Sequence, residues 1–376
     1  KQKTAYELMP SLVGSEMCIR DSIYVGTDDG LVQVTEDGGT TWRRAANPSG
    51  LPEGAFINDV EASQHDPGTV FAVGDNHKKG DFSPYVFESN DHGNTWHSIA
   101  GDLPDGTIGW AIEQDHVLPN LLFLGSEFGL YVSPNAGVNW YMLSGGAPTI
   151  PFRDIEIQRR DNDVVGATFG RGFYVLDDYG PLRDIAGGVL TSSQEGILLP
   201  VRDAWWYVPY VPMQARGKPT LGSDDYTASN PDFGATFTYY LPETATTARE
   251  KRREAERVLR EQGRDVSFPG YDVLRDEEVE ADPQLLVIVR DSQGHPVRWV
   301  EGPSRAGLHR VNWDLRYPPP DPITQSSPGF VPPWVSSPQG PLAAPGVYSA
   351  ELVLVSSAGV RSVSYTHLTL PTILLV

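Results

Sequence analysis

The sequence is poor in cysteine, in basic residues and in long apolar runs. It has one cysteine, Cys18, so it can form neither an internal disulfide nor a zinc site held by several thiolates. Lysine and arginine number 29 against 49 aspartates and glutamates, and this net charge of −20 argues against nucleic-acid or anionic-membrane partners. No apolar run is long enough to span a membrane. Metal-binding His pairs and Gly-rich phosphate loops are also absent, so we expect no metal and no cofactor.

One octet of residues occurs three times. Residues 35–42 read Thr-Glu-Asp-Gly-Gly-Thr-Thr-Trp, residues 89–96 read Ser-Asn-Asp-His-Gly-Asn-Thr-Trp, and residues 133–140 read Ser-Pro-Asn-Ala-Gly-Val-Asn-Trp. The hydroxyl and the Asp or Asn can hydrogen-bond the backbone of their own turn, and the Trp can bury a large ring between sheets. We therefore expect a structural role for Thr35, Asp37, Gly39, Thr41, Trp42, Ser89, Asp91, Gly93, Thr95, Trp96, Ser133, Asn135, Gly137, Asn139 and Trp140.

An apolar run that ends in glycine precedes each octet. These runs end at Gly26, Gly74 and Gly125, and a fourth ends at Gly166 with no octet after it. Alternating segments at residues 57–62, 108–112 and 152–157, typical of half-buried strands, lead into the later runs. A period of about 40 to 50 residues made of short strands and turns predicts a β-propeller with one four-stranded sheet per period. Each octet would form the hairpin between the third and fourth strands of its sheet.

The octets resemble Asp boxes, the signature of bacterial-neuraminidase-repeat propellers, which occur in sialidases, xyloglucan-active glycosidases and sortilin-type receptors. A closer resemblance is to a bacterial group with a sortilin-like propeller, often labelled glycosyl hydrolase. It rests on residues 166–178 (Gly-Ala-Thr-Phe-Gly-Arg-Gly-Phe-Tyr-Val-Leu-Asp-Asp) and 307–317 (Gly-Leu-His-Arg-Val-Asn-Trp-Asp-Leu-Arg-Tyr), and it extends over residues 23–355. The group usually has His where this chain has Phe169, so any role of that His is lost here. The resemblance implies an exported, extracellular or periplasmic protein.

The two ends of the chain do not fit the repeat. Residues 1–22 and 362–376 resemble translated sequencing-adapter read-through, which is seen at the ends of assembled metagenomic genes. Residues 1–22 also lack the basic, apolar and small-residue order of a signal peptide. We expect both segments to be non-native and the chain to be a fragment whose missing blades and signal peptide would lie upstream. The alternative is an ordinary tail and a final strand.

The rest of the chain divides into three parts in this all-β interpretation. Residues 23–183 would form the partial propeller, and residues 184–233 a connector rich in proline and aromatic residues. Trp205-Trp206-Tyr207 in the connector would be a packing seam, or else a platform for a sugar ring. Residues 234–361 have the strand and turn spacing of an immunoglobulin- or fibronectin-like sandwich, with a charged helix inserted at 246–262 and stopped by Gly263.

Two function classes remain open, and the first is a glycoside hydrolase that works through two carboxylates. Xyloglucan-active relatives place a catalytic Asp in a Thr-Asp-x-Gly turn, which resembles Thr27-Asp28-Asp29-Gly30 here. Glu127 lies in the equivalent turn two repeats later. The resemblance thus implies Asp28, and less directly Glu127, as catalytic residues. The alternative is that both carboxylates stabilise tight turns.

The second class is a non-catalytic propeller scaffold that binds a peptide or protein. The loop at residues 77–85 is longer than its counterparts, so His77, Asp81 and Tyr85 are candidate binding residues for a carbohydrate or a peptide. The alternative is a solvated hairpin insertion without a binding role. Arg171 is a further candidate, because a sialidase-like site needs arginines that bind a substrate carboxylate.

Overall fold

The computed structural model describes residues 22–192, 196–207, 228, 231–320, 339–357 and 359–370. Cys18 and most of the first predicted non-native segment, residues 1–21, lie outside this part, as do residues 371–376 of the second. The chain forms two compact units, residues 1–188 and residues 189–376. Each unit is described by itself below.

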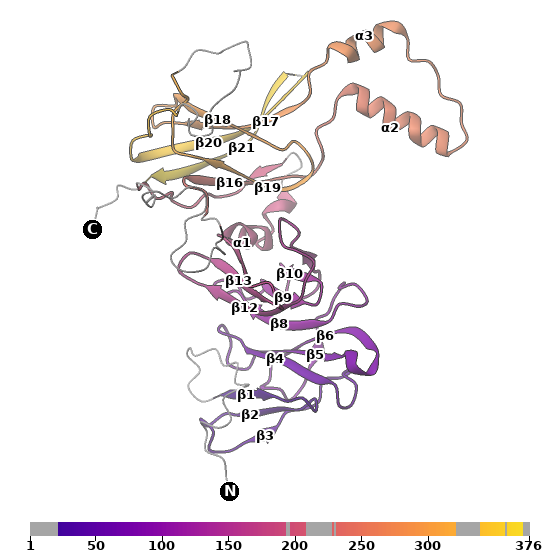
Figure 1. The fold of residues 1–376 in the computed structure, drawn as a ribbon, viewed down its shortest axis with the longest axis vertical. Coiled ribbons are helices and arrows are strands. Elements are labelled where there is room, and N and C mark those ends of the chain that lie inside the picture. Colours follow the sequence, from indigo (N-terminus) through magenta and orange to yellow (C-terminus); the bar gives the residue numbers. More distant parts are fainter. Residues whose placement is uncertain are drawn as a thin grey trace. The chain divides into compact units, whose positions relative to one another are not determined.

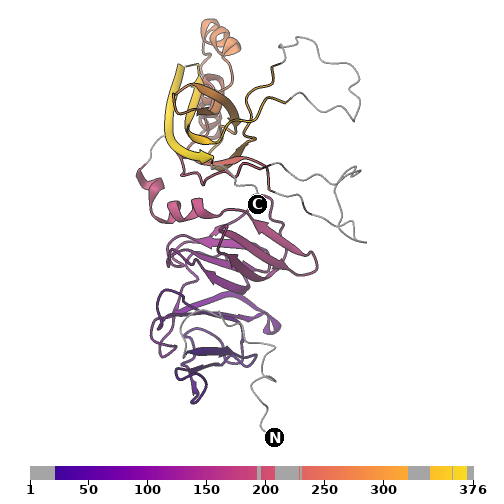
Figure 2. The same cartoon turned by 90° about the vertical axis from the view of Figure 1, so that its left-hand side faces the viewer.

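The first unit contains four antiparallel sheets that follow one another in chain order (Figures 1 and 2). The first sheet consists of β1 (Ile23–Gly26), β2 (Val32–Thr35) and β3 (Arg43–Arg44). The second consists of β4 (Phe56–Ala62), β5 (Val70–Asn76), β6 (Asp81–Ser89) and β7 (His97–Ser98), with the 3-10 turn η2 (His77–Lys79) between β5 and β6. The third consists of β8 (Gly109–Gln114), β9 (Leu122–Ser126), β10 (Gly129–Ser133) and β11 (Tyr141–Met142). The fourth consists of β12 (Phe152–Gln158), β13 (Asp163–Thr168) and β14 (Phe173–Leu176).

Neighbouring strands in each sheet are also consecutive in the chain, which is the up-and-down order of propeller blades and confirms the predicted class. Only the second and third sheets have the four strands predicted for every repeat. The first sheet has no counterpart of β4 among the described residues. The fourth has no outer strand, because after β14 the chain enters helix α1 (Gly180–Ala186) instead of an octet and a fourth strand.

The three octets form the same hydrogen-bonded hairpin. In the second sheet the Ser89 hydroxyl accepts a hydrogen bond from the Gly93 N–H at 2.8 Å and donates one to Asp91 at 2.8 Å. The Asp91 carboxylate accepts from the backbone N–H and the hydroxyl of Thr95, at 2.8 and 2.7 Å. Thr35, Asp37, Gly39 and Thr41 repeat these contacts in the first sheet, and Ser133, Asn135, Gly137 and Asn139 repeat the backbone contacts in the third.

Apolar side chains fill the spaces between successive sheets. The alternation along β5 explains how one strand serves two layers: Val70 and Ala72 pack toward the first sheet, whereas Phe71 and Val73 pack toward the third. The octet tryptophans of the second and third sheets are buried against the sheet before them, with Trp96 only 9% exposed and Trp140 only 6%. Trp42 is 45% exposed, since no sheet precedes it among the described residues.

Helix α1 closes the unit with a buried polar network. The Arg183 guanidinium donates to both oxygens of Asp115, at 2.6 and 2.8 Å, and the Asp115 side chain is fully buried. The Tyr179 hydroxyl donates to the same carboxylate, and its ring packs edge-on against Phe123. The network therefore ties the start of α1 to the chain that follows β8.

The second unit is a sandwich of two antiparallel sheets, as the sequence predicts. The first sheet consists of β15 (Ile197–Leu198), β16 (Ala235–Leu241) and β19 (Gly307–Trp313). The second consists of β17 (Gln284–Arg290), β18 (Pro296–Gly302), β20 (Gly346–Ser356) and β21 (Gly359–Leu370). The 3-10 turn η3 (Val189–Ser192) precedes β15. Side chains from both sheets, among them Phe237, Trp313, Val287 and Leu352, form one core.

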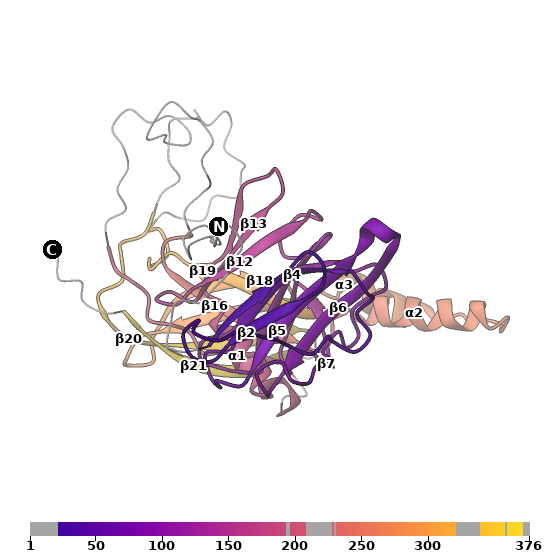
Figure 3. The same cartoon turned by 90° about the horizontal axis from the view of Figure 1, so that it is seen from below.

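The predicted charged helix is present as α2 (Ala248–Glu261), followed by α3 (Tyr271–Val279). Thr247 caps α2 through a capping box with Glu250, and Gly263 follows the helix with a φ of 68°. Arg252 on α2 pairs with Glu277 on α3 at 2.7 Å. Helix α2 extends away from the strands of its own unit, and no residue of it is buried (Figures 1 and 3).

Two further segments with predicted roles belong to this unit. Strand β21 covers residues 362–370, part of the second predicted non-native segment, and its Leu368 and Leu370 are buried in the sandwich core. In the connector, Trp206 packs against the same core and donates to the Ala343 carbonyl at 3.0 Å. Trp205 is 62% exposed.

Candidate functional site

The connections β1–β2, β5–β6, β9–β10 and β13–β14, one from each sheet, define what we call the hairpin end of the first unit. These connections are residues 27–31, 77–80, 127–128 and 169–172. They lie at equivalent places because each sheet has the same strand order. Neighbouring sheets meet here through backbone hydrogen bonds such as Ile57 N–H to the Thr27 carbonyl, 3.1 Å.

Five side chains from three sheets form a continuous group at the hairpin end, which we call the Trp110 cluster: His77, Trp110, Glu127, Arg153 and Phe169. The guanidinium carbon of Arg153 lies 3.4 Å from the ring centre of Trp110 and 5.6 Å from that of Phe169. The His77 ring meets Trp110 edge-on, with 5.8 Å between ring centres. Trp110 therefore lies between a histidine from the second sheet and an arginine from the fourth.

Within this cluster the Glu127 carboxylate contacts both Trp110 and Arg153. Its carboxylate accepts a hydrogen bond from the Trp110 indole N–H at 2.9 Å and pairs with Arg153 at 3.5 Å. The side chains of Arg153 and Glu127 are 40% and 27% exposed, so solvent screens the pair and its net contribution to stability is small. The pair fixes the position of the Arg153 guanidinium over the Trp110 ring.

His77 is oriented by a buried carboxylate. The Asp75 side chain is 3% exposed and accepts hydrogen bonds from the His77 backbone N–H, at 3.1 Å, and from its ring Nδ1. An ionised carboxylate only accepts, so Nδ1 carries a proton and a neutral His77 keeps Nε2 as an acceptor. The ring is one-third exposed, which leaves it accessible to a ligand at the hairpin end.

Exposed phenylalanine side chains recur at the hairpin end. Phe82 follows η2, Phe128 lies in the β9–β10 turn, and Phe169 begins the β13–β14 connection; they are 51%, 55% and 72% exposed. Each of three sheets thus presents one phenylalanine at or beside its own hairpin at this end. Large exposed rings that recur at one end of a molecule are typical of a binding surface.

The other predicted site residues lie outside the Trp110 cluster. Asp28 is exposed in the β1–β2 turn, which is closed by the Thr27 side chain through contacts to Asp29 and to Leu31 and by Gly30 with a φ of 82°. Arg171 is exposed in the β13–β14 hairpin.

Asp81 and Tyr85 are hydrogen-bonded to each other within a single hairpin. The Tyr85 hydroxyl donates to Asp81 at 2.6 Å, and the Ser83 N–H donates to the same carboxylate at 3.1 Å. These hydrogen bonds lower the pKa of Asp81 to about 2, and burial raises the pKa of Tyr85. The structure thus brings two of the six predicted catalytic or binding residues, His77 and Glu127, into the Trp110 cluster.

Sequence reasoning missed Trp110, Asp75 and the carboxylates of the inner strands. Trp110 lies in an alternating segment that by itself predicts only a strand, although its large aromatic side chain was an available signal. Asp59 and Glu61 on β4 and Glu113 on β8 are buried, and burial raises the pKa of all three carboxyl groups, that of Asp59 to about 6. Because burying a carboxylate is costly, alternation alone suggested exposed side chains here.

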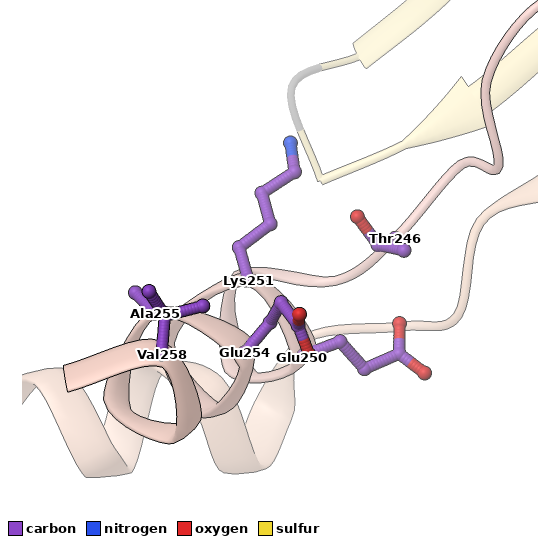
Figure 4. Close-up of a pocket in the computed structure, with 6 residues that line it drawn as sticks. All are labelled: Thr246, Glu250, Lys251, Glu254, Ala255 and Val258. Atoms are coloured by element: carbon purple, nitrogen blue, oxygen red, sulfur yellow. The ribbon is translucent and has the colours of Figure 1, made fainter. Parts of the chain in front are cut away.

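In the described part of the chain, no group of three or more His, Cys, Asp or Glu side chains is arranged to hold a metal ion, and no helix is long and apolar enough to cross a membrane. A shallow hollow beside α2 is lined by Thr246, Glu250, Lys251, Glu254, Ala255 and Val258 (Figure 4). Its charged groups belong to an exposed helix face, where Glu254 pairs with Arg257 at 2.5 Å, and we assign it no function.

Comparisons with known proteins concern the fold alone. No family model and no curated protein matches the chain. A GH74 xyloglucanase from Xanthomonas campestris is 16% identical over 39% of this chain and 24% of its own length, with a TM-score of 0.31. YCF48 bound to D1 peptide is 15% identical over 62% of this chain and 64% of its own, with a TM-score of 0.31. PorZ, a surface component of the type-IX secretion system of Porphyromonas gingivalis, is 14% identical over 94% of this chain and 50% of its own, with a TM-score of 0.28.

All three are β-propeller proteins. The chain spans about a quarter of the xyloglucanase and half of PorZ. At these identities and TM-scores, the similarities carry no argument about activity, and the site has to be interpreted from its own residues.

Proposed function

We propose that residues 23–183 are part of an exported Asp-box propeller of the sortilin-like bacterial group and that its hairpin end binds carbohydrate. In this proposal the octets are Asp boxes with a purely structural role, residues 184–233 are a connector, and residues 234–361 are an accessory sandwich. Residues 1–22 and 362–376 would be non-native. The octet hydrogen bonds described above support the structural role.

The Trp110 cluster carries the proposal. A pyranose ring has an apolar face and a polar edge, so it fits a surface where aromatic rings adjoin groups that hydrogen-bond hydroxyls. Phe128 and Phe169 supply exposed rings, and Arg153 and His77 supply the polar groups. Because Glu127 already pairs with Arg153 and Trp110, we assign it the positioning of Arg153.

A second candidate function is hydrolysis of a glycosidic bond, with Asp28 and Glu127 as the two carboxylates. The observation that favours it is that both residues lie in equivalent turns at the hairpin end, one in the first sheet and one in the third. A retaining or inverting mechanism needs one carboxyl group to be protonated and the other ionised. In that case Glu127, which pairs with Arg153, and Asp28 would be the two carboxyl groups.

Binding to immobilised xyloglucan, other β-glucans and sialosides, measured together with sugar release, tests both candidates. We expect retention on at least one polysaccharide, lost in Trp110→Ala and kept in Trp299→Ala, which changes a half-exposed tryptophan with no predicted binding role. Sugar release that disappears in Asp28→Asn or Glu127→Gln would replace the binding proposal with the enzyme. If the folded protein binds none of the tested glycans but does bind peptides from a random library, the result would instead support a peptide-binding scaffold.

A further inference from the structure

Three carboxyl groups are buried where strands β4 and β8 pack together. Asp59 and Glu61 project from β4 and Glu113 projects from β8, with exposed fractions of 9%, 4% and 7%. The two strands are joined across this region by the Asn58 amide, which donates to the Gly109 carbonyl at 2.8 Å. A second link, between the Ser63 hydroxyl and Gln114 at 2.7 Å, lies at the other end of the seam.

Few hydrogen bonds compensate for this burial. One Asp59 oxygen accepts from the Ile112 N–H at 2.8 Å, whereas the other is fully buried and has no partner among the described residues. Among the described residues, none forms a hydrogen bond with the side chain of Glu61 or Glu113. An ionised Asp59 carboxylate left in this state costs several kcal/mol, so a proton or a counter-charge must compensate for it.

The charged groups that face the cluster do not supply enough counter-charge. Strand β12 contributes the like charges of Asp154 and Glu156, and Arg159 at the end of β12 is the cation that acts on Glu61 and Glu113. One arginine therefore faces a cluster of up to five carboxylates. Burial is the largest cause of the raised pKa of Glu61 and Glu113, and repulsion by the neighbouring carboxylates adds to it.

We propose that Asp59, Glu61 and Glu113 form a proton-binding cluster where β4 packs against β8. The packing of these two strands is stable when the cluster is protonated and is weakened at alkaline pH. A folded state that binds protons more tightly than the unfolded chain loses stability as the pH rises, because the unfolded chain releases those protons first. The stabilisation is therefore complete below the ordinary Glu value of 4.5 and is lost as the pH rises through neutrality into the alkaline range.

The cluster also lies close to the proposed binding surface in the chain. Trp110 and Glu113 are three positions apart on β8, so loosening of this strand reaches the Trp110 cluster. Independently of what the hairpin end binds, the proton cluster would make its geometry dependent on pH.

Thermal unfolding of the whole chain between about pH 5 and about pH 9 tests the proposal. The wild-type melting temperature should fall with rising pH by about 5 °C more than that of Glu61→Gln/Glu113→Gln, in which uncharged amides replace the carboxyl groups. Glu53→Gln, a change of an exposed glutamate in the same unit, should keep the wild-type slope. Hydrogen exchange should show that residues 56–62 and 109–114 open first at alkaline pH. Parallel slopes for the wild type and the double variant would overturn the proposal.

A measurement on the unaltered protein keeps the test decisive if the double variant does not fold. With carbon-13-labelled glutamate, two carboxyl resonances should titrate well above the ordinary Glu value, and Glu61→Gln or Glu113→Gln should remove one each. If every glutamate titrates near 4.5, the cluster does not bind protons in this way.

Discussion

The guanidinium of Arg153 stacks on the ring of Trp110, 3.4 Å from its centre, although the two residues belong to neighbouring sheets. A cation over an indole face contributes about 0.5–1 kcal/mol at an exposed site, and the Arg153 side chain is 40% exposed. The pair places a charged group and an aromatic ring together at the hairpin end. Its geometry leads to the first prediction.

Arg153→Met should separate ligand binding from folding. Methionine keeps much of the apolar stem but removes the charge and the hydrogen-bond donors, so we expect about a tenfold loss of affinity for the retained polysaccharide. Stability should change by less than about 1 kcal/mol, because the arginine is 40% exposed. Calorimetric titration and thermal melts measure the two effects. Arg160→Met, at an arginine that is 84% exposed, is the matched control and should bind normally.

Ser89→Ala should destabilise the first unit by about 1–2 kcal/mol. Its hydroxyl is fully buried and serves both the Gly93 N–H and the Asp91 carboxylate, so alanine leaves a buried donor without a partner. Urea denaturation of this variant and of Ser144→Ala, which changes an exposed serine, gives the comparison. Equal midpoints for the two variants would show that the octet hydroxyl contributes nothing.

The octet tryptophans should differ strongly in their importance. Trp96→Ala removes a ring that fills the space between the first and second sheets, and we expect a loss of about 3–5 kcal/mol. Trp42→Ala removes a ring that is 45% exposed, and the loss should be less than half as large. The measurement is the free energy of unfolding of each variant. Similar losses would mean that Trp42 also packs against an apolar partner.

Local chemistry explains which features the sequence predicted. The hydroxyl, the carboxylate and the glycine of an octet act within eight residues, so their hydrogen bonds follow from spacing alone, as at Ser89, Asp91 and Gly93. The repeat of apolar runs likewise predicted the order of strands in each sheet.

Lateral contacts between sheets did not follow from the sequence. Trp110 and Arg153 are 43 positions apart, and Asp59 and Glu113 are 54 apart, so only the packing angle of the sheets decides whether they meet. The exposure of Trp42 has the same origin, since it depends on what precedes the first sheet and not on the octet itself. The sequence of a single turn, such as the one that contains Asp28, does not show which side chains of the neighbouring sheet lie beside it.

Breaking the pair of Asp115 and Arg183 should be the most damaging single change at the end of the first unit. Arg183→Met leaves the fully buried Asp115 carboxylate with the Tyr179 hydroxyl and backbone N–H groups but no cation, at an expected cost of about 3–5 kcal/mol. The double variant Asp115→Asn/Arg183→Met removes both charges and should recover part of this loss.

Burial alone would raise the pKa of Asp115, but the hydrogen bonds from Arg183 and Tyr179 outweigh it and hold the pKa below the ordinary value of 3.8. The pair therefore stabilises the fold above pH 3.8 and loses its effect as the pH falls below that value, so the advantage of the wild type over the double variant should shrink in strong acid. Chemical denaturation of the three proteins at neutral and acidic pH measures this, and an advantage that stays constant with pH would show that the stability of α1 does not depend on the ion pair.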